Sequence, residues 1–80
     1  MNYEMVEVFK TNVEDPDQAA ELLNQIHKNY TEYKANFDLE DCDKILRVQC
    51  NTGDVQSSFL IQLLKDYGFH SEVLSDELIL

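Results

Sequence analysis

The two cysteines are the side chains of this sequence best suited to soft-metal or redox chemistry. Cys42 and Cys50 are eight positions apart, the first in a polar turn and the second at the end of a predicted strand. Their side chains should therefore lie at different heights, and neither has a histidine or another cysteine beside it, which disfavours a shared metal site. We expect Cys50 to be a small core residue and Cys42 to be exposed.

A second group of candidate ligands is an acidic turn, whose carboxylates would suit a hard cation such as Ca²⁺: Asp38, Glu40, Asp41 and Asp43. The run lacks the spacing, the glycine and the closing glutamate of an EF-hand loop. Charged turns are usually just solvated, and this is the interpretation that we adopt. Asp15 and Asp17 are explained by helix capping.

The positions of the histidines and glycines do not indicate general acid–base catalysis or phosphate binding. His27 lies at the fringe of the apolar stripe of a predicted helix, His70 lies on a predicted strand, and neither has a nucleophile nearby in the sequence. The two glycines, Gly53 and Gly68, are too few for a phosphate-binding loop. The sequence therefore predicts no catalytic residue, no metal ligand set and no cofactor, and we expect the protein not to be an enzyme.

The charge of the chain limits its partners. Sixteen acidic and six basic residues give a formal net charge of −10. Nucleic acid and anionic membranes repel such a surface, so we expect neither as a partner. A basic partner or a cation would be favoured, although the simplest role of the charge is solubility.

The length and the apolar content indicate one globular unit. A chain of 80 residues has room for one core, so we expect a single domain over residues 1–80, ordered over 5–74 and followed by a tail over 75–80. Residues 1–8 show no basic cluster before an apolar run, which disfavours a secretory signal. Without secretion the cysteines should be thiols, and we expect a cytoplasmic protein.

Four segments have the pattern of strands. Residues 5–11 carry apolar side chains on both faces, which is typical of a central strand. Residues 33–39 alternate apolar and polar side chains, a polar turn follows, and residues 44–50 return, so the two segments should form an antiparallel hairpin. Residues 69–74 form the last strand, with Phe69, Ser71 and Val73 on one side.

Two further segments have the spacing of amphipathic helices. The first begins at Asp15-Pro16, where aspartate can cap and proline suits the first helical position, and it extends to about Asn29. The second follows the candidate caps of residues 51–54 and ends near Gly68. Its predicted buried stripe consists of Val55, Phe59, Leu60, Leu63, Leu64 and Tyr67.

The order of these elements predicts an α+β fold of the ferredoxin-like βαββαβ type. Both helices are amphipathic, so each should bury one face against the same sheet. We expect a two-layer sandwich with a four-stranded antiparallel sheet and both helices on one face.

Over residues 5–74 the chain resembles the heavy-metal-associated domain, the copper-chaperone-like family with this topology. Val13 stands at the place of the family's loop methionine, and Gly68-Phe69 resembles its transition from the second helix to the last strand. The family's Cys-x-x-Cys binds Cu(I) through two thiolates, but those places hold Asp15 and Gln18 here. The resemblance therefore implies the family's fold, in a divergent member that lacks the metal motif and its activity.

The apolar residues of the first strand predict an interface. If Val6 and Val8 face the helices, then Met5, Phe9 and Ile45 face outward, and such an exposed cluster often marks a binding surface. Two alternatives stay open. The segment Leu78-Ile79-Leu80 could cover the cluster, or the register of the first strand could be displaced by one residue.

The leading hypothesis is a small non-enzymatic module that binds an unidentified protein or a second copy of itself. One alternative is a metal-handling domain that uses oxygen donors or the lone thiols. Another is a small-molecule regulatory domain, because this fold serves many functions.

Overall fold

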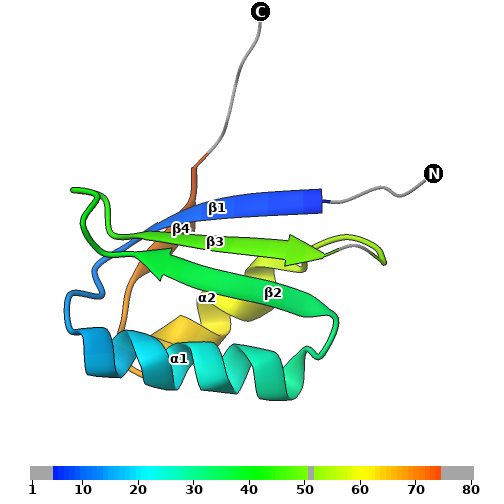
Figure 1. Cartoon of the computed structure of the whole chain (residues 1–80), viewed down its shortest axis with the longest axis horizontal. Helices are drawn as coiled ribbons and strands as arrows, with labels where there is room; N and C mark the ends of the chain where they lie inside the picture. Colours follow the sequence, from blue (N-terminus) through cyan, green and yellow to red (C-terminus); the bar gives the residue numbers. More distant parts are fainter. Residues whose placement is uncertain (1–4, 51, 75–80) are drawn as a thin grey trace, which may run out of the picture.

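The computed structural model describes residues 5–50 and 52–74, which form four strands and two helices (Figure 1). In chain order these are β1 (Met5–Thr11), α1 (Pro16–Asn29), β2 (Tyr33–Asp38), β3 (Ile45–Cys50), α2 (Ser57–Asp66) and β4 (Ser71–Val73). The candidate cover Leu78-Ile79-Leu80 lies outside the described residues.

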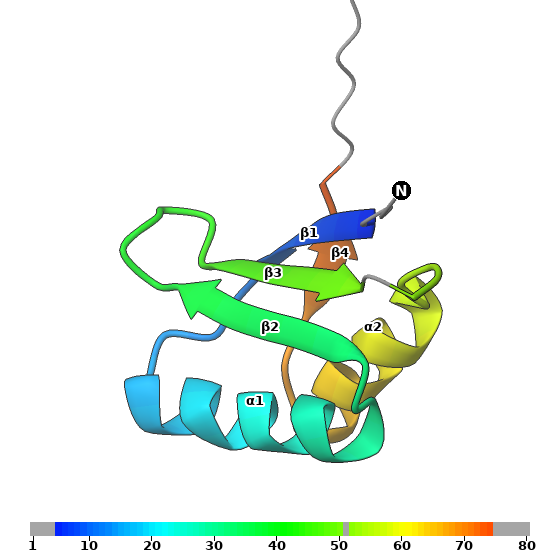
Figure 2. The same ribbon diagram turned by 45° about the vertical axis from the view of Figure 1, so that its right-hand side comes forward.

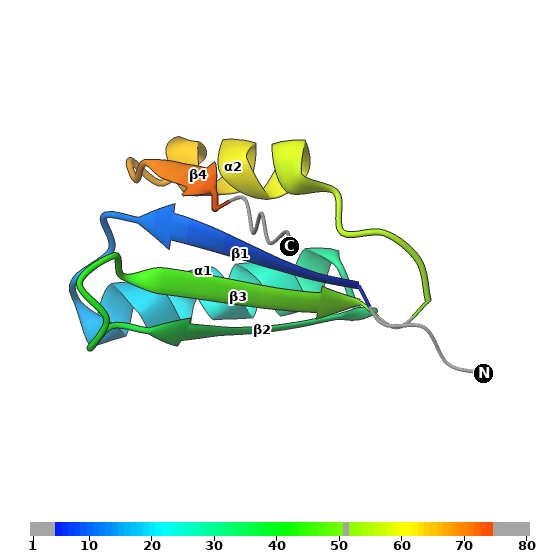
Figure 3. The ribbon, with the colours of Figure 1, turned by 90° about the horizontal axis from the view of Figure 1, so that it is seen from above.

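The strands form one antiparallel sheet in the order β2-β3-β1-β4, with β1 and β3 at its centre. Both helices lie on the same side of the sheet, and no element of the described residues covers the other face, which we call the open face (Figure 2). Seen from above, α1 underlies the β2–β3 hairpin and α2 lies beside β4 (Figure 3). This arrangement is the predicted ferredoxin-like two-layer sandwich. Neither described helix is long and apolar enough to cross a membrane.

Helix α1 begins as the sequence predicts. Asp15 is the N-cap, and its carboxylate accepts a hydrogen bond of 2.8 Å from the backbone N–H of Asp17. Pro16 follows at the first helical position, where its missing N–H leaves no internal bond unmade. The face that α1 presents to the sheet carries the buried residues Ala19, Leu22 and Ile26.

The N-terminus of helix α2 is stabilised by a different interaction from the predicted side-chain cap. Its N-cap is Gln56, which makes no side-chain capping hydrogen bond and lies beyond the predicted caps of residues 51–54. The hydroxyl of buried Tyr33 instead accepts a 2.8 Å hydrogen bond from the Gln56 N–H. A side chain of β2 thus holds the start of α2 over the sheet, which short-range sequence patterns do not reveal.

The core lies between the sheet and the helices, and it corrects the predicted face of β1. Phe9 is paired with Leu46, and both are fully buried, whereas Val6 is 47% exposed. Because β1 is apolar on both faces, its alternation could not decide which set points inward. The inward-facing residues are Met5, Glu7, Phe9 and Thr11, so the alternative of a register displaced by one residue is the correct one.

The predicted interface of Met5, Phe9 and Ile45 is therefore not an exposed patch. Met5 is half-buried and packs against the core from the helix side. Ile45 does lie on the opposite face from Leu46, as predicted, but it is only 6% exposed. Met5 and Phe9 face the helices whereas Ile45 faces the other way, and only Met5 keeps partial exposure, so the three residues form no common apolar surface.

Candidate functional site

Two hollows flank α2, one on each side of the helix. Phe59, Gln62, Leu63 and Asp66 border the hollow toward α1. Ile61 and Lys65 border the other hollow, toward the start of β4. Between these two sets, Leu60 and Leu64 are fully buried against the sheet.

The first hollow, which we call the interhelical groove, carries exposed aromatic side chains. Phe59 is 54% exposed and Tyr67 is 45% exposed, although the helical stripe predicted both to be buried. Successive residues of a helix are turned by about 100°, so burial of Leu60 and Leu64 leaves Phe59 well outside the core face. The groove has a volume of about 340 Å³, and the described residues that line it are Gln25, Asn29, Tyr30, Phe59, Gln62, Leu63, Asp66 and Tyr67.

The walls of the interhelical groove are held by local contacts. Tyr30 stacks on Tyr33 with a centroid distance of 5.1 Å, which fixes the ring at the end of α1. Gln62 donates a hydrogen bond of 2.9 Å to the carboxylate of Asp66, one turn further along α2. Asp66 is the one charged side chain among the described lining residues. The groove thus combines aromatic rings and amides with a single negative charge.

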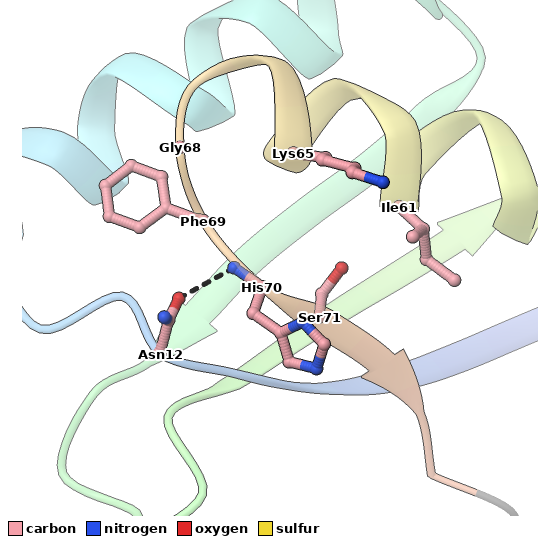
Figure 4. A pocket seen from close by; sticks show the side chains of 7 residues that line it. All are labelled: Asn12, Ile61, Lys65, Gly68, Phe69, His70 and Ser71. Atoms are coloured by element: carbon pink, nitrogen blue, oxygen red, sulfur yellow. Dashed lines mark hydrogen bonds between the residues drawn. The ribbon is translucent and has the colours of Figure 1, made fainter.

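The second hollow, which we call the β4 pocket, has a volume of about 430 Å³ (Figure 4). Its wall is formed where Gly68, at φ 91°, ends α2 and turns the chain toward β4. Asn12 braces this turn in two ways: its N–H donates to the His70 carbonyl at 3.2 Å, and its side-chain oxygen accepts from the His70 N–H at 2.9 Å. The side chains of Ile61, Lys65, Phe69 and Ser71 also line the pocket.

One buried polar atom of the β4 pocket has no hydrogen-bond partner among the described residues. Ser71 is 6% exposed, and its hydroxyl oxygen has no hydrogen-bond partner among the described residues. The hydroxyl points toward the space between Lys65 and Ile61 (Figure 4). Burial without a partner is unusual for a side-chain hydroxyl, so this atom requires a physical explanation.

The cysteines lie where the sequence predicts. Cys50 is buried in the core, Cys42 is exposed, and they form no disulfide with each other. Cys50 lies 3.5 Å from the hydroxyl of Thr52, which provides its polar contact. Neither placement brings the two thiols together as a metal pair.

The acidic turn brings three ligand atoms together, because those of Asp41, Cys42 and Asp43 lie within 4.8 Å of one another. The Asp41 carboxylate accepts a 2.9 Å hydrogen bond from the Asp43 N–H, and that of Asp38 accepts one from the Glu40 N–H at 3.3 Å. Such bonds are how aspartates stabilise turns. These carboxylates therefore have a structural explanation, and we infer no metal site from them.

His27 has a structural role that the sequence did not reveal. Its Nε2 accepts a hydrogen bond of 3.0 Å from the backbone N–H of Ala35 in β2. Because β2 is an edge strand, this contact pairs a backbone group on the side away from β3. His27 thus ties α1 to the sheet, and His70 is exposed at the rim of the β4 pocket.

The open sheet face is charged rather than apolar. Three of the six basic residues, Lys10, Lys34 and Arg47, lie on it together with Asp38 and Glu72. Val6 is its one strongly exposed large apolar residue within the described chain. This composition is typical of a solvated sheet face.

Comparison with known proteins finds no match: no family model, no curated protein and no solved structure matches the chain significantly.

Proposed function

We propose that the chain is a non-enzymatic protein-binding module whose binding surface is the interhelical groove. The observation that carries the proposal is the exposure of two large aromatic residues, Phe59 and Tyr67, on the same groove. Large aromatic side chains anchor protein interfaces because they bury much area at little conformational cost. Leu63 and Tyr30 lie beside them and extend the apolar floor.

The charge of the chain favours a cationic partner. The net charge is −10, and the one charged side chain that lines the groove within residues 5–50 and 52–74 is the carboxylate of Asp66. A second copy would bring another −10 and would be repelled, so we favour a different protein over self-association. The partner is an amphipathic segment with apolar side chains for the groove and basic side chains for its rim, such as a helix laid between α1 and α2.

The resemblance to the heavy-metal-associated family stays a prediction, supported by the βαββαβ order and by Gly68-Phe69 after α2. Metal transfer is not the function we propose, because the Asp15 carboxylate is engaged as the cap of α1. The two unpaired cysteines support a reducing compartment, and we propose the cytoplasm.

The proposal is tested by titrating the ¹⁵N-labelled protein with a leucine–lysine peptide of amphipathic helical pattern. We expect saturable amide shifts at Asn29, Phe59, Leu63 and Tyr67. A scrambled peptide of equal composition keeps the charge but loses the apolar face, so it should bind more weakly. Shifts confined to the acidic turn, or equal binding of the two peptides, would mean that charge alone drives association and that the groove is not a binding surface.

A further inference from the structure

We propose that the β4 pocket binds a small organic monocarboxylate with an apolar body, independently of the interhelical groove. The pocket volume of about 430 Å³ falls within the range of roughly 300–1,000 Å³ that is usual for small-molecule sites. Its lining combines a cation, an unpaired hydroxyl and two apolar side chains, Ile61 and Phe69. Each of these parts matches one part of such a ligand.

The first part is the Ser71 hydroxyl. Its cross-strand neighbour in β1 is Thr11, which is buried to a similar degree. The Thr11 hydroxyl donates to the Lys44 carbonyl at 2.6 Å and accepts from the Val13 N–H at 3.2 Å. Ser71 makes no equivalent bonds, so its hydroxyl is available to donate to a ligand oxygen.

The second part is the Lys65 ammonium. No ion pair involves Lys65 within the described residues, and its side chain extends over the pocket in Figure 4. A carboxylate oxygen could accept from both Lys65 and Ser71, and hydrogen bonds to a charged group are the stronger ones. The position of Lys65 in the last turn of α2 also suits the helix dipole, so the residue is favoured there without a ligand.

The net charge selects among anions. A chain of charge −10 opposes every negative ligand, and it opposes a dianion more than a monoanion. One ammonium and one hydroxyl can compensate a carboxylate, whereas a phosphate would bring a second charge without a partner. The ligand should therefore carry one negative charge.

The third part is the apolar wall. Ile61 and Phe69 are both partly buried and pack against the core, and each leaves part of its side chain at the pocket. An aliphatic or aromatic ligand body would cover this remaining apolar area, which is favourable. Because the Ser71 oxygen is itself out of contact with solvent, the ligand reaches it only after a neighbouring side chain moves aside.

The test is a titration with phenylacetate, followed by amide shifts of the whole ¹⁵N-labelled chain. We expect saturable shifts at Ile61, Gly68, His70 and Ser71, and weaker binding of the uncharged analogue phenylacetamide. Ser71→Ala and Lys65→Gln should each weaken phenylacetate binding about tenfold, as loss of a hydrogen bond to a charged group does. Lys28→Gln removes the matching lysine in the last turn of α1, away from the pocket, and should leave the affinity unchanged.

The outcomes separate clearly. Failure of phenylacetate to shift these amides would overturn the proposal, as would equal affinities for wild type, Ser71→Ala and Lys65→Gln. Both variants are expected to fold, since one removes an unpaired atom and the other alters an exposed side chain. Phe59 and Tyr67 line the interhelical groove, so the effect of Phe59→Ser and Tyr67→Ser on peptide binding is independent of the phenylacetate result.

Discussion

Thr11 and Ser71 face each other across β1 and β4, and only one of these two buried hydroxyls is satisfied. Thr11 bonds both to the Lys44 carbonyl and to the Val13 N–H, and it thereby ties β1 to the start of β3 and to the loop before α1. The Ser71 hydroxyl has no partner in the described chain. Thr11 and Ser71 are thus buried to a similar degree, 7% and 6% exposed, but removal of the two hydroxyls should affect stability differently.

The first prediction follows from this contrast. Thr11→Val keeps the shape but leaves the part-buried Lys44 carbonyl and the buried Val13 N–H without their partner, which should cost about 1–3 kcal/mol. Ser71→Ala removes an atom that has no bond to lose, so the variant should be as stable as wild type or slightly more stable. Urea unfolding of the three proteins, without any ligand, measures both differences. A larger loss for Ser71→Ala than for Thr11→Val would mean that the Ser71 hydroxyl is paired in solution.

The second prediction tests the inward face of β1. Phe9→Asp places a carboxylate in the fully buried core and should leave the protein largely unfolded, because small domains have only roughly 5–15 kcal/mol of stability. Val6→Asp puts the same side chain on the open face, where it should cost less than about 1 kcal/mol. Circular dichroism during heating distinguishes the two variants. The reverse order of stability would restore the register in which Val6 faces the helices.

The third prediction concerns the link between α1 and β2. His27→Ala removes the acceptor of the Ala35 N–H, so hydrogen exchange at that amide should accelerate and stability should fall by about 1 kcal/mol. Lys28→Ala changes the neighbouring helical residue and serves as the control. An unchanged rate of hydrogen exchange at the Ala35 amide in His27→Ala would show that the hydrogen bond to His27 does not protect the β2 edge.

The fourth prediction concerns nucleic acid. Lys10, Lys34 and Arg47 lie on the open sheet face, but Asp38 and Glu72 are interspersed with them and the net charge is −10. We expect no binding of mixed RNA or DNA at physiological salt, because phosphate binding needs a surplus of cations. A mobility-shift assay suffices. A salt-sensitive complex of micromolar affinity would show that the open face acts as a basic patch despite its acidic neighbours.

Local patterns predicted the elements and their order because each one carries its own signal. Asp15-Pro16 marked the start of α1, alternation marked the β2–β3 hairpin, and Gly68 marked the end of α2. These signals depend on neighbours in the chain, and the fold they predict is the one observed. The burial of Cys50 followed from its place among apolar neighbours on β3.

The surface features depend on contacts between distant segments, and there the sequence was insufficient. β1 is apolar on both sides, so the choice of Phe9 over Val6 for the core required its pairing with β3 and β4. On α2, Ile61 packs against the core, so the buried face of the helix is centred away from Phe59. The presence of an isoleucine at position 61 was the sequence signal from which the exposure of Phe59 could have been predicted. The unpaired Ser71 hydroxyl appears only when all neighbouring donors and acceptors are placed.

The central claim is that the exposed aromatics of the interhelical groove form a binding surface. Calorimetric titration of the leucine–lysine peptide into wild type, Phe59→Ser/Tyr67→Ser and Val6→Ser tests it most directly. All three proteins have the same charge. Val6 is an exposed apolar residue on the open sheet face, away from the groove, so Val6→Ser controls for the loss of an exposed apolar side chain elsewhere on the molecule. We predict equal Kd values for wild type and Val6→Ser, and a Kd at least about tenfold higher for the double variant. Equal affinity of all three proteins, or no binding to wild type, would contradict the claim.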